Sequence, residues 1–155
     1  MTARGRTIGP ESLELIARAT GGYPFMIQLV GYHVWRKASG SIIENSAAVA
    51  GIEQARTRLG SLVHAPALQD LSEVDRTFLV AMAHDDGPSK VAEVARRMGK
   101  NAQYTNVYRA RLIAAGIISS TSYGAVDFAL PYLREHLRAH AAHLLSSGDQ
   151  ARGLG

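Results

Sequence analysis

Two adjacent glycines and a proline stand close together in the stretch TGGYPFMIQLVGYHVWR, which runs from Thr20 to Arg36. Gly21 or Gly22 can adopt the positive φ that ends a helix, and Pro24 has the φ angle of a first helical turn. The sequence therefore predicts one helix that ends at the glycine pair and a second helix that begins at Pro24. Because the turn between them is so short, the two helices must cross at a corner.

The apolar pattern on both sides of this turn predicts a small helical bundle. The first helix follows Pro10 and has apolar residues at helical spacing, namely Leu13, Ile16 and Ala17. The second helix, at about 24–38, is apolar almost all round, which predicts that it is the buried centre of the bundle. A polar link at 39–46 and a third helix at about 47–62 complete a predicted helical domain over residues 10–65.

Three further helices are predicted after residue 70. Ser72 is a predicted N-cap with Asp75 three residues later, and the helix that it begins ends near residues 84–87. A short amphipathic helix follows at 88–99 and is closed by a glycine. The last of the three carries residues 104–115.

The pattern then changes to the period of β-strands. Two short strands are predicted at 117–121 and 125–129, around the turn Ser122-Tyr123-Gly124. Helix, short helix, turn, helix and β-hairpin is the order of a winged helix-turn-helix. The predicted fold class is therefore mainly α, with the bundle followed by a winged helix at 70–145, closed by a helix from Pro131, and a frayed tail at 146–155.

Positive charge is concentrated in this second half. The net charge of the chain is +4, yet the segment from Pro88 to Gly116 has a local excess of five positive charges, so the rest is close to neutral. Its cations are Lys90, Arg96, Arg97, Lys100, Arg109 and Arg111. An excess of this kind indicates a polyanionic partner, and a solvated helical face is the alternative.

The predicted helix at 104–115 has side chains suited to reading DNA. If Thr105, Tyr108 and Leu112 face inward, the amides and arginines face outward or lie on the flanks. Amides can read adenine edges, and arginines can bind phosphates or guanine. The predicted DNA-binding residues are Arg96, Arg97, Lys100, Gln103, Asn106, Arg109 and Arg111.

The predicted hairpin has one feature that favours DNA binding and two that oppose it. Tyr123 at its tip could enter a minor groove, but Asp127 would repel phosphate and no lysine or arginine lies on the two strands. Many winged helices bind proteins instead of DNA, so a protein-interaction role stays open.

Histidines and aspartates give no catalytic or metal site. His136, His140 and His143 have a spacing that would let two imidazoles meet one metal ion, but no cysteine or well-placed carboxylate accompanies them. We expect them to face solvent near a helix end, and we expect Asp85-Asp86 to be an exposed turn. The sequence predicts neither a metal ligand set nor a catalytic residue.

Composition indicates the cellular compartment of the protein and excludes some kinds of chemistry. The chain has 155 residues and no cysteine, which removes disulfides and thiolate chemistry. No run of eighteen apolar residues is present, and the first six residues lack the hydrophobic region of a signal peptide. We therefore expect a cytoplasmic protein.

The stretch ATGGYPFMIQLVGYHVW resembles part of a known family, as do LSEVDRTFLVAMA, VARRMGKNAQYTNVYRARLIAAGII and VDFALPYLREHLR. The order of these stretches is similar to the C-terminal end of bacterial and archaeal AAA-type ATPases, in particular the signal-transduction branch that is similar to origin-recognition ATPases. The likeness covers roughly residues 8–140. In that family a P-loop core is followed by a helical lid and a winged helix.

The resemblance implies a non-catalytic C-terminal region, because the chain contains no G-x-x-x-x-G-K-[ST] motif. The core that binds ATP and Mg²⁺ would lie upstream, and this region would bind no cofactor itself. The family places the turn Gly21, Gly22, Tyr23 and Pro24 near the bound nucleotide, although the turn could simply join two helices.

The function predicted from this resemblance is that of a lid followed by a winged helix that binds double-stranded DNA. Two alternatives stay open. The winged helix could be a protein-interaction or autoinhibitory module of the ATPase, or the chain could be a free-standing transcription regulator.

Overall fold

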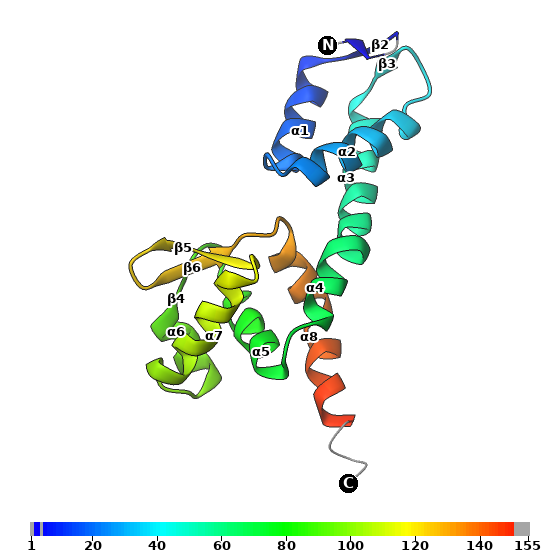
Figure 1. Cartoon of the computed structure of the whole chain (residues 1–155). Coiled ribbons are helices and arrows are strands. Elements are labelled where there is room, and N and C mark those ends of the chain that lie inside the picture. The colour runs from blue at the N-terminus through cyan, green and yellow to red at the C-terminus, as the bar shows by residue number, and fades with distance from the viewer. Residues whose placement is uncertain (1, 4, 151–155) are drawn as a thin grey trace. The chain divides into compact units, whose positions relative to one another are not determined.

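The computed structural model describes residues 2, 3 and 5–150, with side-chain surroundings for residues 5–141. The described chain is mainly helical and has two small sheets (Figure 1). It divides into two compact units, unit 1 at Met1–Val63 and unit 2 at His64–Gly155. The boundary at Val63 lies close to residue 65, where the predicted helical domain ends.

Unit 1 is built on three helices, α1 (Pro10–Thr20), α2 (Pro24–Lys37) and α3 (Asn45–Leu59). The predicted turn between the first two is confirmed, because Gly21 and Gly22 have φ angles of 55° and 73°. The N–H of Gly21 donates to the carbonyl of Arg18, and Pro24 opens α2. Both glycines thus take a conformation that a residue with a Cβ adopts only with strain.

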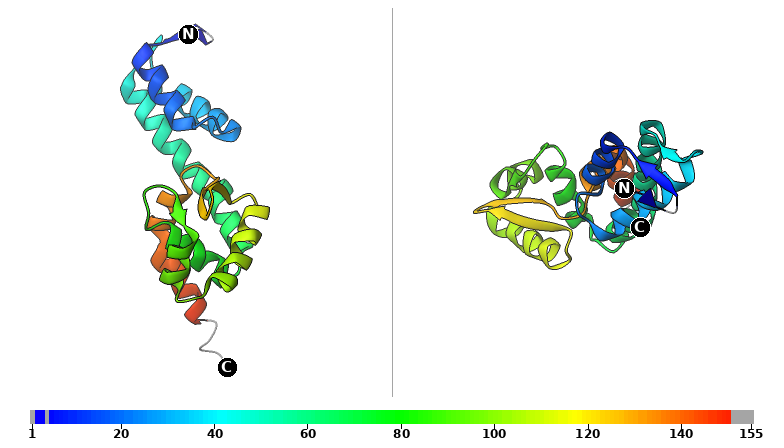
Figure 2. Two further views of the ribbon diagram at one scale, coloured as in Figure 1. Left: turned by 90° about the vertical axis from the view of Figure 1, so that its left-hand side faces the viewer. Right: turned by 90° about the horizontal axis from the view of Figure 1, so that it is seen from above.

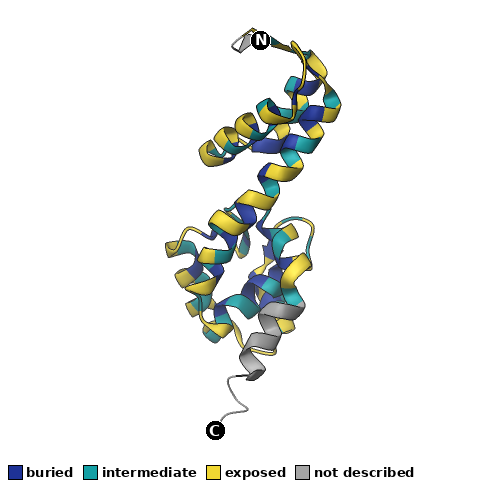
Figure 3. Ribbon diagram, turned by 90° about the vertical axis from the view of Figure 1, so that its right-hand side faces the viewer, coloured by how far each residue is buried: buried dark blue, intermediate teal, exposed yellow. Residues whose placement is uncertain are grey.

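Helices α2 and α3 approach each other closely at a glycine. A Cβ added to Gly51 would lie 2.5 Å from the backbone nitrogen of Val34, so only glycine fits there. The buried face of α2 consists of Met26, Val30 and Val34. Figure 3 shows buried residues where the helices of unit 1 face one another and exposed residues on their outer faces.

The expectation that α2 is the buried centre of the bundle is wrong. Ile27 and Tyr32 are both more than half exposed, and Phe25 is also exposed. With only two neighbouring helices, α1 and α3, the unit cannot cover every side of α2. An all-round apolar pattern therefore overstated its burial.

A small sheet of very short strands was not predicted. It contains β1 (Thr2–Ala3), β2 (Arg6–Ile8) and β3 (Ile42–Ile43), with β2 antiparallel to β1 and parallel to β3. Segments of two or three residues are too short to show the alternation that identifies a strand. The guanidinium of Arg6 supports this sheet, since it donates to the Trp35 carbonyl at 2.6 Å and lies 4.2 Å from the centre of the Trp35 ring.

The chain enters unit 2 within a π-helical stretch, Gly60–His64, which precedes α4 (Ala65–Gln69). Three more helices follow, α5 (Glu73–Met82), α6 (Val91–Met98) and α7 (Ala102–Ala114). The predicted N-cap is confirmed, because the Ser72 hydroxyl accepts from the Asp75 N–H and the Asp75 carboxylate accepts from the Ser72 N–H. This reciprocal pair is a capping box.

A three-stranded antiparallel sheet completes unit 2. Its strands are β4 (Ser89–Lys90), β5 (Ile118–Ser122) and β6 (Ala125–Phe128), in the order β4-β6-β5. The β5–β6 hairpin matches the predicted one, whereas β4 was not predicted. The turn of the hairpin projects beyond the helices of unit 2 in Figure 1 and in the right-hand view of Figure 2.

The core of unit 2 lies between its helices and this sheet. Fully buried members include Phe78, Leu79, Met82, Val94, Leu112, Ile118, Val126 and Leu137. The last of these belongs to α8 (Leu133–Gln150). Residues 146–150 of the predicted frayed tail are therefore helical, and residues 151–155 lie outside the described part of the chain. None of the helices described is long and apolar enough to cross a membrane.

Candidate polyanion-binding surface

Helix α7 has one buried side and one free side. Thr105 and Leu112 are buried and Tyr108 is half-buried, as the sequence indicated, while Gln103, Asn106 and Ala110 are exposed. Asn101 caps the helix, since its side-chain oxygen accepts from the N–H of Tyr104 at 2.8 Å. The exposed side also contains Val107, which is 56% exposed and was missed because an apolar residue was assigned to the core by default.

Arg97 is held inside unit 2 and does not project freely. Its guanidinium donates to both carboxylate oxygens of Asp85 at 2.8 Å and to the Ala81 carbonyl at 2.8 Å. The Ser89 hydroxyl donates to the same carboxylate. The hydrogen bond from Arg97, then that from Ser89, lowers the pKa of Asp85 to about 2. Arg97 thus joins α6 to the end of α5.

Arg111 is also engaged internally. Its guanidinium donates at 3.1 Å to Asp75, whose carboxylate is buried and already belongs to the capping box of α5. Removing Arg111 would leave a buried carboxylate without its cation, which is costly. The sequence alone did not show this pair because the two residues are 36 positions apart.

The remaining predicted cations have looser partners. Arg96 pairs with Glu93 on the exposed face of α6. The ammonium of Lys100 lies 5.0 Å from the centre of the Tyr104 ring, and Arg109 donates to the Ser120 hydroxyl at 2.7 Å. Neither of the last two forms an ion pair among the described residues. Lys100 is exposed and Arg109 is half-buried, and both keep a positive charge that no carboxylate of the described residues pairs with.

The one carboxylate of the predicted hairpin strands, Asp127, is paired with an arginine. Asp127 accepts from Arg134 at 2.6 Å and from the backbone N–H of Phe128 at 2.8 Å. This ion pair offsets the repulsion expected between Asp127 and a phosphate. Tyr123, at the turn, is fully exposed.

The histidines of α8 do not all face solvent as expected. His136 is half-buried, its ring stacks on that of His140, and it lies edge-on to buried His64. Burial, followed by the neighbouring His64 and His140, lowers the pKa of His136 to about 4. The side chain of His143 lies outside the described residues. Within the described part of the chain, no group of three or more histidine, cysteine, aspartate or glutamate residues could hold a metal ion.

His64 has an unusual hydrogen-bond arrangement. Its Nε2 lies 2.8 Å from the Pro131 carbonyl, to which it must donate, and its Nδ1 is buried without a partner. Burial lowers the pKa of His64. A proton added at Nδ1 would find no acceptor, so this cluster favours neutral imidazoles.

The two residues of the acidic pair Asp85-Asp86 bind different arginines. Asp85 is bound by Arg97 as described above, and only Asp86 is fully exposed, with Arg138 donating to it at 2.9 Å. The pair is therefore more ordered than the exposed turn that the sequence indicated.

The turn Gly21, Gly22, Tyr23 and Pro24 belongs to unit 1, whereas every predicted DNA-binding residue belongs to unit 2. A Cβ added to Gly21 or Gly22 would meet no atom within 4 Å, so this turn is open to its surroundings. The structure thus describes the two predicted sites in separate units.

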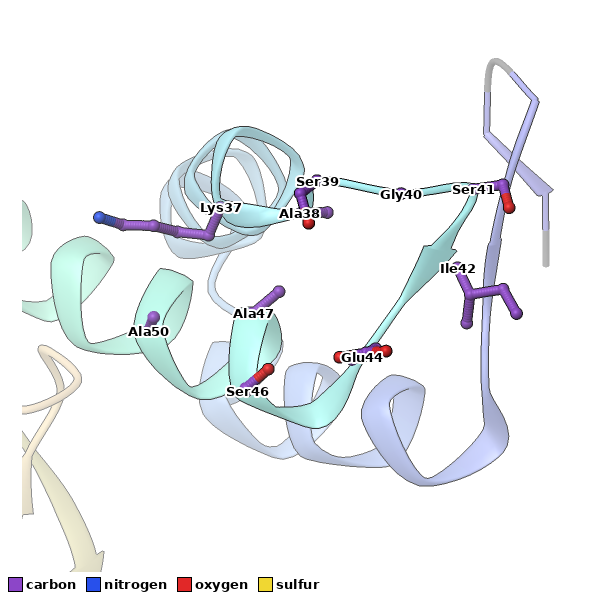
Figure 4. Close-up of a pocket in the computed structure, with 10 residues that line it drawn as sticks. All are labelled: Lys37, Ala38, Ser39, Gly40, Ser41, Ile42, Glu44, Ser46, Ala47 and Ala50. Atoms are coloured by element: carbon purple, nitrogen blue, oxygen red, sulfur yellow. The ribbon is translucent and has the colours of Figure 1, made fainter.

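A hollow in unit 1 lies between the end of α2, strand β3 and the start of α3 (Figure 4). Small and polar side chains line it, including Ser39, Ser41 and Ser46. Glu44 faces this hollow, but the Lys37 side chain extends away from Glu44 along the other side (Figure 4). No histidine lines the hollow, and Glu44 is the one carboxylate among its lining residues.

One family model matches part of the chain. A family model described as a domain of unknown function (DUF8462) matches residues 61–137, a little under half of the sequence. The matched range contains all the predicted DNA-binding residues. Neither the curated proteins nor the solved structures yielded a match.

Proposed function

We propose that unit 2 is a winged helix-turn-helix that binds double-stranded DNA, with α7 as the helix that enters the major groove. The order α5, α6 and α7 followed by a β-hairpin supports this proposal. A short turn with Gly99 at φ 66° joins α6 to α7, as helix-turn-helix proteins require. Strand β4, paired with β6, supplies the third strand of the small sheet of such a fold.

The single observation that carries the proposal is the free side of α7. Gln103, Asn106 and Val107 are exposed there, which gives two amides and an apolar group on one helix. Amides can donate and accept at adenine, and an apolar side chain can contact the methyl group of thymine. This side of α7 therefore has groups for both bases of an A·T pair in the major groove.

Lys100 and Arg109 would supply phosphate contacts beside these residues. Arg96 could join them from α6, since its partner Glu93 is on an exposed face where ion pairs are weak. Arg97 and Arg111 hold the fold together and are left out of the interface. These phosphate contacts, about three in number, should contribute about −3 to the slope of log affinity against log salt.

The test uses a fluorescein-labelled duplex and fluorescence anisotropy over a salt series. Lys100→Glu should weaken binding by about tenfold at low salt and flatten the slope by one to two units. Asn106→Ala should change the preferred sequence and leave the slope nearly constant. Arg18→Glu is the matched control, because Arg18 is an exposed cation of unit 1.

Equal binding by Lys100→Glu and Arg18→Glu would remove α7 from the interface. Variants at Arg97 or Arg111 are unsuitable for this purpose, because they would disturb Asp85 or Asp75 and could unfold unit 2.

A protein-interaction or autoinhibitory module is the second candidate. Two exposed apolar side chains favour it, Val107 on α7 and Tyr123 at the hairpin turn. The internal pairing of Arg97, Arg111 and Arg134 also leaves fewer cations for DNA. Binding to a protein surface would depend weakly on salt, and Tyr123→Ser would weaken it more than Lys100→Glu.

For unit 1 we propose the role of the helical lid of an AAA-type ATPase. The glycine turn between α1 and α2 supports this proposal, since both glycines take the positive φ that the GGYP stretch requires. ATP and Mg²⁺ would bind to a P-loop core upstream, beside the open turn at Gly21, Gly22, Tyr23 and Pro24. The chain itself would then be non-catalytic and cytoplasmic.

Calorimetry and a phosphate-release assay test this second proposal. The chain alone should neither bind ATP at micromolar concentration nor release phosphate above a buffer blank, because no Gly-rich loop is available to position phosphates. A genomic reading frame that begins at Met1 with no P-loop upstream would favour a free-standing transcription regulator.

A further inference from the structure

A second group of cations lies in unit 1, far from the basic segment in sequence. It lines a groove between α2 and α3, with Tyr32, His33, Arg36 and Lys37 on one wall and Gln54 and Arg58 on the other. Arg36, Lys37 and Arg58 are all exposed. This group was not predicted from the sequence, because Lys37 and Arg58 are separated by a stretch that contains Glu44 and Glu53.

Close packing of the two helices brings these cations together. At Gly51 the backbone of α3 comes so near to α2 that a Cβ would lie 2.6 Å from the Cα of Val34. Because a helix repeats every 3.6 residues, Gln54 and Arg58 follow Gly51 on the side that faces α2. Cations of both helices therefore border one groove.

No carboxylate neutralises this groove among the described residues. Arg36, Lys37 and Arg58 take part in none of the ion pairs found there. Arg36 donates to the Tyr32 hydroxyl at 2.7 Å, and the Lys37 side chain extends away from Glu44 (Figure 4).

The pKa of His33 reflects the positive charges around the groove. Burial lowers the pKa of His33, and so do the charges of Arg58, Arg36 and Lys37, all of which are positive. The groove thus has an unbalanced positive potential.

We propose that this groove binds the phosphate backbone of DNA, so that unit 1 provides a second, sequence-independent contact surface. The inference rests on the proposed function, which supplies DNA as the polyanion. Guanidinium groups bind phosphate oxygens in pairs, and an ammonium adds a point charge. Three cations with no carboxylate partner would release counterions when they meet phosphates.

The construction of the groove favours a polymer over a free nucleotide. All of its lining residues belong to α2 or α3. Most backbone N–H groups in helices are already bonded, so only side chains are left to bind phosphate. A free nucleotide is normally bound by backbone N–H groups at a glycine-rich loop or helix N-terminus, and no such cradle borders this groove.

The experiment measures anisotropy of a fluorescein-labelled duplex of about 20 base pairs with the full chain, a length near two helical turns of DNA. Arg58→Gln removes one cation whose side chain forms no ion pair with the described residues. It should weaken binding several-fold at low salt and reduce the salt slope by about one unit. The triple variant Arg36→Gln/Lys37→Gln/Arg58→Gln should reduce the slope by about two to three units.

Arg18→Gln is the control, as an exposed cation of the same unit that pairs with Glu14 on α1. Fluorescence of Trp35, the only tryptophan, verifies that unit 1 stays folded in each variant. A salt slope that is the same for Arg58→Gln, the triple variant and Arg18→Gln would overturn the inference.

Variants of the two units separate this inference from the proposed function. Loss of affinity in Lys100→Glu but not in the triple variant rejects the groove and keeps α7 as the interface. Loss in the triple variant but not in Lys100→Glu supports the groove and rejects α7. A parent chain that binds anionic lipid vesicles and no duplex overturns the assignment of the groove to DNA.

Discussion

Three arginines of unit 2 and two arginines of unit 1 differ in their partners. In unit 2, Arg97, Arg111 and Arg134 donate to carboxylates that are buried or half-buried. In unit 1, Arg36 and Arg58 border a groove and take part in no ion pair of the described residues. The segment from Pro88 to Gly116 of unit 2 has a local excess of five positive charges in the sequence, but part of that charge holds the elements of the unit together. Charge counted along a sequence shows how many cations are present, and only contacts show how many are available.

Different packing explains this contrast. Unit 1 is held by close contact of helices, which Gly51 permits and which requires no charge. Unit 2 has a small sheet beside its helices, and its arginines add hydrogen bonds between neighbouring elements, as Arg97 does between α6 and the end of α5. Four predictions test this contrast, in order of decreasing expected effect.

The largest effect is expected at the contact between α2 and α3. Gly51→Ala places a Cβ against the backbone of Val34 and should cost about 3 kcal/mol of unfolding free energy, although no charge is altered. Urea denaturation followed by Trp35 fluorescence would measure unit 1 alone. An unchanged midpoint would mean that the helices have room to separate.

A matched pair of arginines compares the two units directly. Arg97→Ala should cost about 2 kcal/mol, because Asp85 loses a bidentate partner and is only partly exposed. Arg58→Ala should change stability by less than about 0.5 kcal/mol, since the Arg58 side chain is exposed and forms no ion pair with the residues that the structure describes. Thermal unfolding by circular dichroism measures both, and equal costs would contradict the contrast.

Mild acid should act on unit 2 before unit 1. The pKa of His136 is lowered to about 4 in the fold and returns to its ordinary value near 6.5 on unfolding. The fold then binds fewer protons than the unfolded chain, so stability is complete above pH 6.5 and is lost as the pH falls toward 4. The loss should be about 2 kcal/mol after allowance for partial exposure.

Far-UV circular dichroism and Trp35 fluorescence, recorded together between pH 7 and 4, measure this effect. Helical signal should decrease before the tryptophan signal changes. His136→Phe should flatten the response, and a response that stays the same in that variant would assign it to other groups.

The smallest effect concerns the glycine turn of unit 1. Gly22→Val should cost about 1 kcal/mol, because Gly22 has φ 73° although space for a side chain is free. Gly31→Ala is the matched control within α2, where a Cβ is also unobstructed and alanine should stabilise by up to about 1 kcal/mol. Equal midpoints for the two variants would mean that φ at residue 22 is not restrictive.

Local signals made much of this fold predictable from the sequence. The glycine pair at 21 and 22, and the capping box of Ser72 and Asp75, act within a few residues, and both were predicted correctly. Strands β1, β3 and β4 have two residues each and carry no periodic signal. They form because a partner strand is nearby in space, which a sequence pattern does not show.

The candidate sites were less predictable because they depend on distant pairs. Arg111 pairs with Asp75, which is 36 positions away in the sequence, and Arg97 pairs with Asp85, which is 12 positions away. Both were predicted to bind DNA from their local charge alone. The groove in unit 1 was missed for the converse reason, since α2 and α3 bring Arg36 and Arg58 together only after they have packed.

The central claim is that the free side of α7 contacts DNA, and an NMR titration tests it most directly. Isotope-labelled chain would be titrated with an unlabelled duplex while backbone amide signals are followed. We predict shifts at Gln103, Asn106 and Val107, with smaller shifts at Tyr123 and Arg58. Shifts that leave α7 unchanged, or no shift at millimolar duplex in low salt, would contradict the proposal.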